Sequence, residues 1–191
     1  MNFAQLNQSL SVQLARIRSF MSLALLVRAL VGLVSAEENP KASLDHWKTL
    51  VRSKFPSVPQ LACADFALWM ADTNRLRPLL LDVRTAAEFS VSHISGATRV
   101  DPDTSLETLQ PLLKSTQRPI VLYCSVGWRS SELGQRLIKS GRTQVMNLEG
   151  SLFQWANEDQ ALENAKGPTD QVHPYNATFG RLLKPSKRAV Q

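Results

Sequence analysis

The residues best suited to chemistry are the six from Cys124 to Arg129, with the sequence Cys-Ser-Val-Gly-Trp-Arg. They follow the apolar run 119–123 and precede residues 130–133, which have the pattern of a first helical turn. A tight loop between a buried strand and a helix directs backbone N–H groups and the positive end of the helix dipole toward the cysteine. Such surroundings can lower a thiol pKa from about 8.5 to roughly 3.5–7.5. We therefore predict a nucleophilic thiolate at position 124.

The other residues of this loop have roles that follow from their types. Gly127 supplies a residue free to adopt a positive φ where the chain curls around the sulfur. Ser125, Val126 and Trp128 are expected to line the mouth of the site, with Trp128 limiting which molecules approach. An ordinary core position for Cys124 is the alternative, since free cysteines are often buried.

Charged and polar residues near the loop allow more than one interpretation. Arg129 either steers an anionic substrate or serves as a structural partner of Asp82 or Glu88. Asp82 is expected to position the loop rather than to act as an acid catalyst. Ser130 is expected to cap the following helix. Cys63 is expected to be structural rather than a second reactive thiol.

Composition excludes several kinds of protein. The 191-residue chain is 43% hydrophobic and 20% charged, which indicates a globular fold rather than a disordered one. Two cysteines are too few for a disulfide framework or a cysteine-rich zinc site, and the three histidines lack ligand spacing. We therefore expect no metal and no cofactor.

The net charge of +6 is concentrated at the two ends of the chain. Residues 1–36 and the last 21 residues contain basic but no acidic side chains, and the part between them is close to neutral. Basic charge carried by two terminal segments is weak evidence for nucleic-acid binding. We therefore predict no nucleic-acid partner.

Residues 1–36 have the pattern of a targeting segment. Arginines precede and interrupt an apolar stretch over 20–34, and small residues at 34–36 form a cleavage-like site before two glutamates. This outline fits a signal peptide and favours an exported or periplasmic protein. The acid-free, Arg- and Ser-containing composition also fits an organellar transit peptide, and a start at Met21 leaves a cytoplasmic location open. Because Arg28 interrupts the apolar run, this stretch is not expected to form a membrane-spanning helix. Membrane contact is expected only through residues 1–36, if they are uncleaved.

From residue 57 onward, short apolar runs alternate with helical patterns. Strands are expected at 58–61, 79–84, 98–101, 119–123 and 144–148. Helices are expected at 65–71, after the capping box that begins at Thr85, around 106–113, from 130 to Gly141, and at 151–158. This alternation predicts an α/β fold, with an open sheet flanked by helices on both faces. Ligands bind such sheets at the carboxyl ends of the strands, where Asp82 and Cys124 both lie.

Two segments flank this alternating region. A helix over 43–55 is expected to pack on the domain, with Ser43 as its N-cap. Trp47 in this helix, like Trp69 and Trp155, is expected to be a core residue. The segment 161–191 is too apolar near Phe179, Leu182 and Leu183 to be a loose end, so we predict that it packs back on the domain. The basic residues after Lys184 are expected to be mobile.

Several motifs within residues 57–158 together resemble a rhodanese domain. They are Asp82-Val83-Arg84, Glu88-Phe89, His93-Ile94 with Gly96-Ala97, the 124–129 loop with Ser130, and Glu149-Gly150 before Trp155. The resemblance implies a parallel sheet flanked by helices and a cysteine that carries a persulfide. Around that cysteine we assign supporting roles to Asp82, Arg84, Glu88 and Ser130. The organisation is then a targeting segment over 1–36, a linker and peripheral helix over 37–56, a rhodanese-like domain over 57–160 and a tail over 161–191.

The resemblance implies a sulfurtransferase of the thiosulfate-using type. Cys124 would take a sulfane sulfur from a small anionic donor such as thiosulfate and pass it to cyanide, a thiol or a protein acceptor. Related phosphatases and arsenate reductases have a longer loop that surrounds a tetrahedral oxyanion, so the spacing from Cys124 to Arg129 argues against phosphate chemistry. A persulfide carrier without turnover, or a protein-interaction module, remains the alternative.

Overall fold

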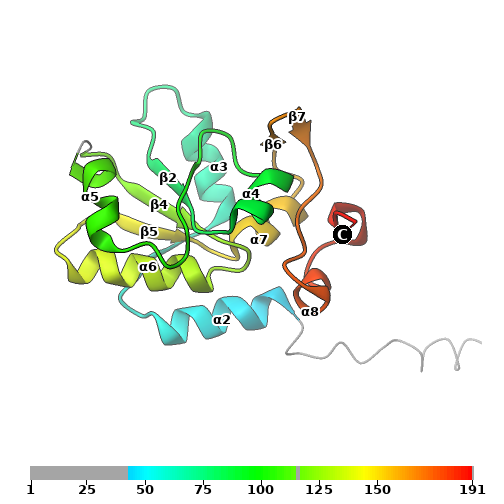
Figure 1. Ribbon diagram of the computed structural model, residues 1–191, viewed down its shortest axis with the longest axis horizontal. Coiled ribbons are helices and arrows are strands. Elements are labelled where there is room, and N and C mark those ends of the chain that lie inside the picture. The colour runs from blue at the N-terminus through cyan, green and yellow to red at the C-terminus, as the bar shows by residue number, and fades with distance from the viewer. Residues whose placement is uncertain (1–42, 115–116, 191) are drawn as a thin grey trace, which may run out of the picture. The chain divides into compact units, whose positions relative to one another are not determined.

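The computed structural model describes residues 43–114 and 117–190, and the predicted targeting segment lies outside this range. A five-stranded parallel sheet with the strand order β1-β5-β4-β2-β3 forms the centre of the fold (Figure 1). Its strands are β1 (Gln60–Leu61), β2 (Leu79–Asp82), β3 (Thr98–Arg99), β4 (Ile120–Tyr123) and β5 (Val145–Leu148). The predicted α/β class and all five predicted strands are confirmed, although each strand is shorter than its apolar run.

The two central strands are buried on both sides. All four residues of β2 and all four of β4 are buried, so neither strand shows the polar alternation of a half-exposed sheet. Successive side chains enter two different cores: Leu80 and Val121 belong to one cluster, and Leu81 and Leu122 belong to the other. Two apolar layers are therefore required, one on each face.

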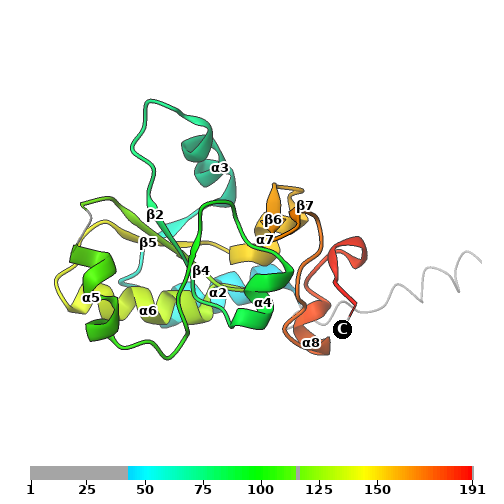
Figure 2. The ribbon, with the colours of Figure 1, turned by 45° about the horizontal axis from the view of Figure 1, so that its top comes forward.

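Helices supply both layers, as predicted (Figures 1 and 2). One face is covered by α3 (Cys63–Ala71) and α7 (Ser151–Asn157), whose buried residues share a cluster with Leu80 and Val121. The other face is covered by α5 (Leu106–Lys114) and α6 (Trp128–Lys139). The short α4 (Ala86–Val91) follows β2.

The peripheral helix α2 (Leu44–Lys54) begins where the sequence indicated. The Oγ of Ser43 accepts a hydrogen bond from the N–H of His46 at 3.1 Å and caps the helix. Val51 and Phe55 pack against Trp128 at the beginning of α6, in a small cluster separate from the two main cores. The helix thus lies against the end of the 124–129 loop.

The C-terminal segment also packs on the domain. Val172, Leu182 and Leu183 are buried in the same cluster as α3 and α7. The segment contains elements that the sequence analysis did not predict: β6 (Leu162–Asn164), β7 (Gly167–Thr169), α8 (Ala177–Gly180) and the 3-10 turn η2 (Pro185–Lys187).

The expectation of a mobile basic end was wrong. The N–H of Val172 donates to the carbonyl oxygen of Lys187 at 2.7 Å, and the N–H of Ala189 donates back to the carbonyl oxygen of Val172 at 3.0 Å. Lys184 and Lys187 both form ion pairs with Asp159 at 2.8 Å. Backbone hydrogen bonds to the buried Val172 therefore hold the basic residues after Lys184 against the domain.

Two helix boundaries refine the sequence predictions. Helix α3 begins at Cys63, two residues before the predicted start at Asp65, so Cys63 lies in the first turn. Gly141, with φ +90°, follows the last turn of α6 as predicted. Within 43–114 and 117–190, no helix is long and apolar enough to cross a membrane.

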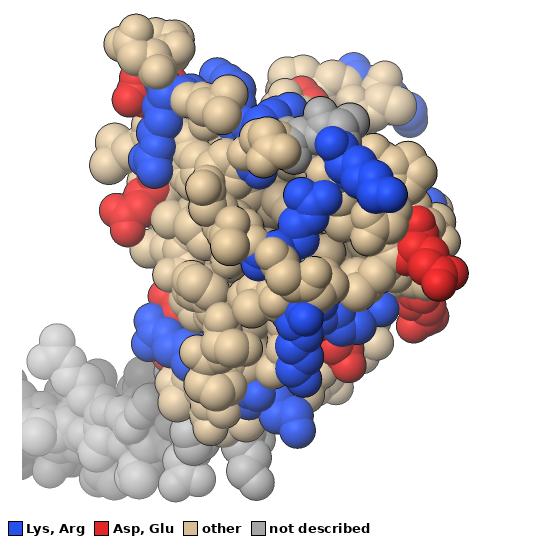
Figure 3. Space-filling model, turned by 90° about the vertical axis from the view of Figure 1, so that its left-hand side faces the viewer, with Lys and Arg blue, Asp and Glu red and all other residues tan. Residues whose placement is uncertain are grey.

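Basic side chains are also visible on the folded domain itself. Figure 3 shows more Lys and Arg than Asp and Glu on the face that lies at the left of Figure 1, where α5 is found. The charges of the nearly neutral middle part of the chain are therefore unevenly distributed, with basic side chains in excess on this face.

The packing of the C-terminal segment predicts a stability effect. Leu183 is 2% exposed and Val190 is 99% exposed. Replacing Leu183 by Ala should lower the free energy of unfolding by about 2–5 kcal/mol, because a large buried side chain is lost and a cavity remains. Chemical denaturation monitored by tryptophan fluorescence measures this change. The control Val190→Ala should leave stability within experimental error, and equal stability of the two variants would contradict the described packing.

Candidate active site

The loop between β4 and α6 curls so tightly that it requires glycine at one position. Gly127 is the N-cap residue of α6 and has φ +102°, a conformation that side chains other than glycine rarely adopt. A Cβ atom there would also lie 3.1 Å from Nδ2 of Asn147. The glycine predicted from the sequence is thus required by both backbone conformation and space.

The sulfur of Cys124 lies at the N-terminus of α6, where hydrogen-bond donors converge. The N–H of Gly127 donates to Sγ at 3.2 Å, and the backbone N–H and hydroxyl of Ser130 also interact with this sulfur. Burial opposes ionisation, but the positive charge of Arg129 and these hydrogen bonds outweigh it and lower the pKa of the Cys124 thiol. The site therefore stabilises the thiolate relative to a cysteine in water.

Cys63 has the opposite environment. Its side chain is buried, and its Sγ contacts the carbonyl oxygen of Glu149 at 3.5 Å. Burial raises the pKa of the Cys63 thiol far above its ordinary value, and the charge of Glu158 adds to the increase. Only one of the two cysteines therefore lies in surroundings that favour nucleophilic chemistry.

Helix α7 fixes the backbone of the loop from the side. The N–H groups of Leu152 and Phe153 donate to the carbonyl oxygens of Cys124 and Ser125 at 3.1 and 3.0 Å. The Oγ of Ser151 accepts from the N–H of Cys124 at 3.2 Å, and Ser151 has the unusual φ of +53°. The first turn of α7 therefore anchors the loop, a role of Ser151 that the sequence analysis did not recognise.

A carboxylate holds the other side of the loop. Both oxygens of Glu88 accept hydrogen bonds from Arg129, at 2.9 and 2.7 Å, and Oε1 also accepts from the hydroxyl of Ser125 at 2.8 Å. The same carboxylate completes the predicted capping box with Thr85. Of the partners considered for Arg129, Glu88 is therefore the one found, and Asp82 is not.

Asp82 and Arg84 form a separate pair away from the sulfur. Their side chains are fully buried, with Nη2 of Arg84 2.6 Å from Oδ2 of Asp82 and 2.6 Å from the carbonyl oxygen of Ser92. The pair joins the end of β2 to the end of α4, so it positions the helix that carries Glu88. Neither side chain has a hydrogen bond to Cys124 among the described contacts, and their support of the site is indirect.

The expected capping role of Ser130 was wrong. Helix α6 begins at Trp128, so Ser130 lies within the first turn, and no side chain caps the helix. The Ser130 hydroxyl instead lies 2.6 Å from Oδ1 of Asn147, a fully buried polar residue of β5, as well as near the Cys124 sulfur. Because the sulfur occupies the place where a capping oxygen would lie, a side-chain cap is not needed.

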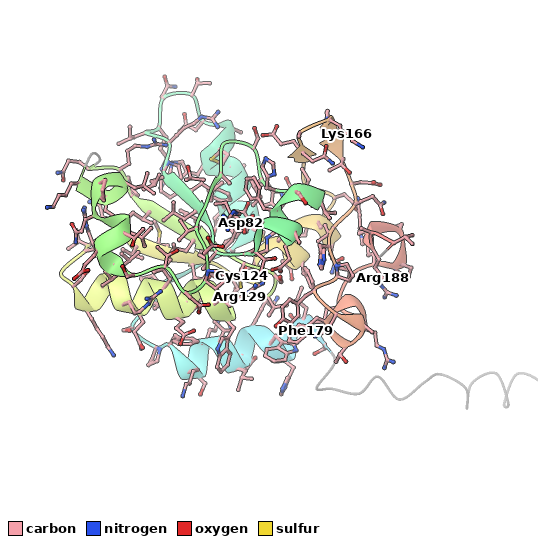
Figure 4. The ribbon with its side chains drawn as sticks, in the orientation of Figure 1. Asp82, Cys124, Arg129, Lys166, Phe179 and Arg188 are labelled. Carbon is pink, nitrogen blue, oxygen red and sulfur yellow. The ribbon has the colours of Figure 1, made fainter. Side chains whose placement is uncertain are left out.

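A pocket of about 320 Å³ opens above the sulfur. The predicted residues Ser125, Val126, Trp128 and Arg129 line it together with Cys124. It is also lined by residues that the sequence analysis did not assign to the site: Trp47, Leu50, Tyr175 and Phe179. Figure 4 shows Phe179 at α8, below and to the right of Cys124 and Arg129 in this view.

The position of Trp47 corrects a prediction. Trp69 and Trp155 are buried core residues as expected, whereas Trp47 is only partly buried and forms part of the pocket wall. Its helix lies outside the alternating pattern, so no sequence signal related it to the loop. Among residues 43–114 and 117–190, no cluster of three or more His, Cys, Asp or Glu side chains is arranged to hold a metal ion.

Comparison with known proteins agrees with this geometry. Residues 64–158 match the Rhodanese-like domain family. A protein of Allochromatium vinosum named Sulfurtransferase is 32% identical over 98 residues, which cover 51% of this chain and 88% of that protein. The chain therefore belongs to the rhodanese-like domain family, and it is homologous to sulfurtransferases.

Two further matches show the extent of the similarity. The protein YqhL of Bacillus subtilis is 35% identical over 82 residues, which cover 43% of this chain and 64% of YqhL. The crystal structure of thiosulfate sulfurtransferase from Pseudomonas aeruginosa superimposes with a TM-score of 0.51 and 22% identity, over 64% of this chain and 23% of that one. This structural match shows a shared fold.

The pairing of Glu88 with Arg129 predicts a pH-dependent stability. Burial alone would raise the pKa of Glu88, but Arg129, Thr85 and Ser125 lower it from 4.5 to about 2. Because the pKa in the folded state lies below the ordinary value, this stabilisation is present above about pH 4.5 and is lost as the pH falls toward 2. A shift of this size corresponds to roughly 3 kcal/mol.

Replacing Glu88 by Gln should therefore lower the free energy of unfolding at neutral pH and flatten its decline between about pH 4.5 and pH 2. Urea denaturation at a series of pH values measures both effects. The matched control is Glu132→Gln, at an exposed position on α6. Stability curves that run parallel for Glu88→Gln and the original protein would refute the assigned ion pair.

Proposed function

We propose that this protein is an enzyme that transfers a sulfane sulfur from a small donor to a thiophilic acceptor through a persulfide on Cys124. The observation that carries the proposal is the position of the Cys124 sulfur, which faces converging N–H donors at the N-terminus of α6 and lines a pocket. Membership of the rhodanese-like family supports the same chemistry.

The first half of the reaction loads the cysteine. The Cys124 thiolate attacks the outer sulfur of a donor such as thiosulfate and forms a new S–S bond. The original S–S bond of the donor breaks, and sulfite leaves with the bonding electron pair. The donors that now surround Sγ, among them the N–H of Gly127, would then stabilise negative charge on the persulfide.

The second half regenerates the thiolate. A nucleophile such as cyanide, a thiol or a protein thiol attacks the outer sulfur, and the bond between Sγ and that sulfur breaks with its electrons remaining on Cys124. Ser125, Val126 and Trp128 line the pocket through which the acceptor would reach this sulfur. No metal or redox cofactor is needed. The first step exchanges the S–S bond of the donor for the S–S bond of the persulfide, and the second exchanges that bond for a bond to the acceptor.

The arrangement of Arg129 favours sulfur transfer over phosphate chemistry. Phosphate chemistry would require the loop itself to enclose a tetrahedral dianion and to bind it with free cationic donors, whereas thiosulfate needs to present only its outer sulfur to Cys124. The Arg129 guanidinium already donates two hydrogen bonds to Glu88 and one to Ser125, at 2.7–2.9 Å. A single additional sulfur atom fits a short loop with few free charges better than a phosphate does.

Replacing Cys124 by Ser tests the proposal. Incubation with thiosulfate should add the mass of one sulfur atom to the original protein and to the control Cys63→Ala, and none to Cys124→Ser. Turnover of thiosulfate and cyanide to thiocyanate should likewise be lost only in Cys124→Ser. Persulfide formation that survives in Cys124→Ser would overturn the assignment of the nucleophile.

The same assay separates an enzyme from a carrier. A persulfide that forms on Cys124 and is released at a useful rate to small acceptors supports the enzyme. A persulfide that forms but is released only to a protein partner would instead support the persulfide carrier. Absence of any persulfide, with every sulfur donor tried, would refute both.

A further inference from the structure

Part of the wall of the pocket above Cys124 comes from outside the region that matches the family. The family match covers residues 64–158, whereas α2 contributes Trp47 and Leu50, and the C-terminal segment contributes Tyr175 and Phe179. The domain supplies the reactive loop, and the two flanking segments determine what can reach it. The pocket is therefore a feature of this chain that membership of the family does not explain.

Aromatic side chains from α2 and the C-terminal segment form a continuous wall of the pocket. The rings of Trp47 and Phe179 lie 4.9 Å apart, and those of Tyr175 and Phe179 lie 5.4 Å apart. On the other side Trp47 meets Trp128 edge-on at 6.5 Å. Such contacts fix the orientation of the rings beyond what burial alone achieves.

Tyr175 is held in place at the mouth of the pocket. Its ring lies over the Arg129 guanidinium at 5.2 Å, within the range of a cation–π interaction. Its backbone has φ +65°, which is unusual for a bulky side chain. Strained positions of this kind are retained where the surrounding structure requires them, and they cluster at functional sites.

The pocket offers a small anionic acceptor such as cyanide no free cation to bind. Among the described residues that line it, Arg129 is the one with a formal positive charge, and Glu88 neutralises it through two hydrogen bonds. Trp47, Leu50, Val126 and Phe179 offer apolar surface instead. An acceptor with an apolar body gains free energy in such surroundings, while a hydrated anionic acceptor loses its water without gaining an unpaired cation.

We infer that the pocket selects an organic thiol with an aromatic or branched aliphatic group next to its sulfur as the sulfur acceptor, in preference to cyanide or a small polar thiol. This inference rests on the proposed function. The volume of about 320 Å³ lies at the lower end of the range for small-molecule sites, so it fits one ring or a short branched chain. Trp47, Tyr175 and Phe179 are then specificity-determining residues.

The transfer step balances without a further reagent. The sulfur of the acceptor thiol attacks the outer sulfur of the Cys124 persulfide anion and forms a new S–S bond, and the thiol proton moves to the transferred sulfur. The bond from that sulfur to Sγ breaks, its electron pair remains on Cys124 as the thiolate, and the organic persulfide leaves with the proton. The apolar group of the acceptor contacts the aromatic wall throughout.

Alkylation of Cys124 tests the pocket without requiring turnover. The rates of reaction with iodoacetamide and with N-benzyl iodoacetamide are compared, each divided by the rate with N-acetylcysteine to correct for intrinsic reactivity. Mass spectrometry of peptides confirms that Cys124, not Cys63, is modified. Burial of the benzyl group should favour N-benzyl iodoacetamide by about tenfold or more in the original protein.

Variants identify the part of the pocket that is responsible. Tyr175→Ala and Phe179→Ala should each reduce the preference for the benzyl reagent several-fold. Leu68→Ala, at a residue that is 71% exposed and does not line the pocket, should leave it unchanged. Because Tyr175 is 47% exposed, its replacement tests the wall even if Phe179→Ala fails to fold. A ratio of the two corrected alkylation rates near one would overturn the inference. So would a ratio that neither Tyr175→Ala nor Phe179→Ala reduces.

A second arm distinguishes the failure of this inference from the failure of the proposed function. Persulfide-loaded protein is mixed with 2-phenylethanethiol or with 2-mercaptoethanol, two aliphatic thiols that differ mainly in their apolar group. Faster transfer to 2-phenylethanethiol, reduced in Tyr175→Ala, supports the inference. Equal transfer to both thiols refutes it while the proposed function stands. If no persulfide forms, the proposed function fails, and with it the choice of a thiol as the ligand, although the alkylation ratio still reports an apolar pocket.

Discussion

A hydrogen bond from the N–H of Gly127 to the sulfur of Cys124, at 3.2 Å, is the contact around which the site is organised. It requires a chain that reverses within three residues, and this reversal is possible because residue 127 has no Cβ. The reversal places the sulfur at the positive end of α6, where Ser130 and Arg129 add to the stabilisation. Burial at the end of β4 would otherwise favour the neutral thiol, so the loop must provide more stabilisation than burial removes.

The remainder of the fold keeps this loop rigid. Helix α7 holds its backbone through Leu152 and Phe153, and α4 holds its side chains through Glu88. Each anchor comes from a different strand–helix connection. These connections meet at the carboxyl ends of the parallel strands, where the Cys124 loop also lies. Around this centre, α2 and the C-terminal segment build part of the pocket wall from residues that lie outside the family match over 64–158.

Local patterns allowed much of the site to be predicted, and long-range contacts explain the rest. The apolar run before Cys124, the glycine at 127 and the capping box at Thr85 each act over a few residues, so the sequence indicates them directly. The roles of Ser130 and Ser151 depend on partners 17 and 27 residues away, at Asn147 and Cys124, and no short pattern records such distances. Trp47, Tyr175 and Phe179 reach the pocket from segments without the strand–helix alternation, and only tertiary packing brings them to the loop.

Direct titration of the Cys124 thiol tests the account most sharply. The ultraviolet absorbance of the thiolate is recorded against pH, and the curve of Cys124→Ser is subtracted to remove the contributions of Cys63 and the tyrosines. We expect a midpoint clearly below the value of roughly 8.5 for a free cysteine, which rises when Arg129 is replaced by Ala. A midpoint at or above that of a free cysteine would contradict the stabilised thiolate on which the proposed chemistry depends.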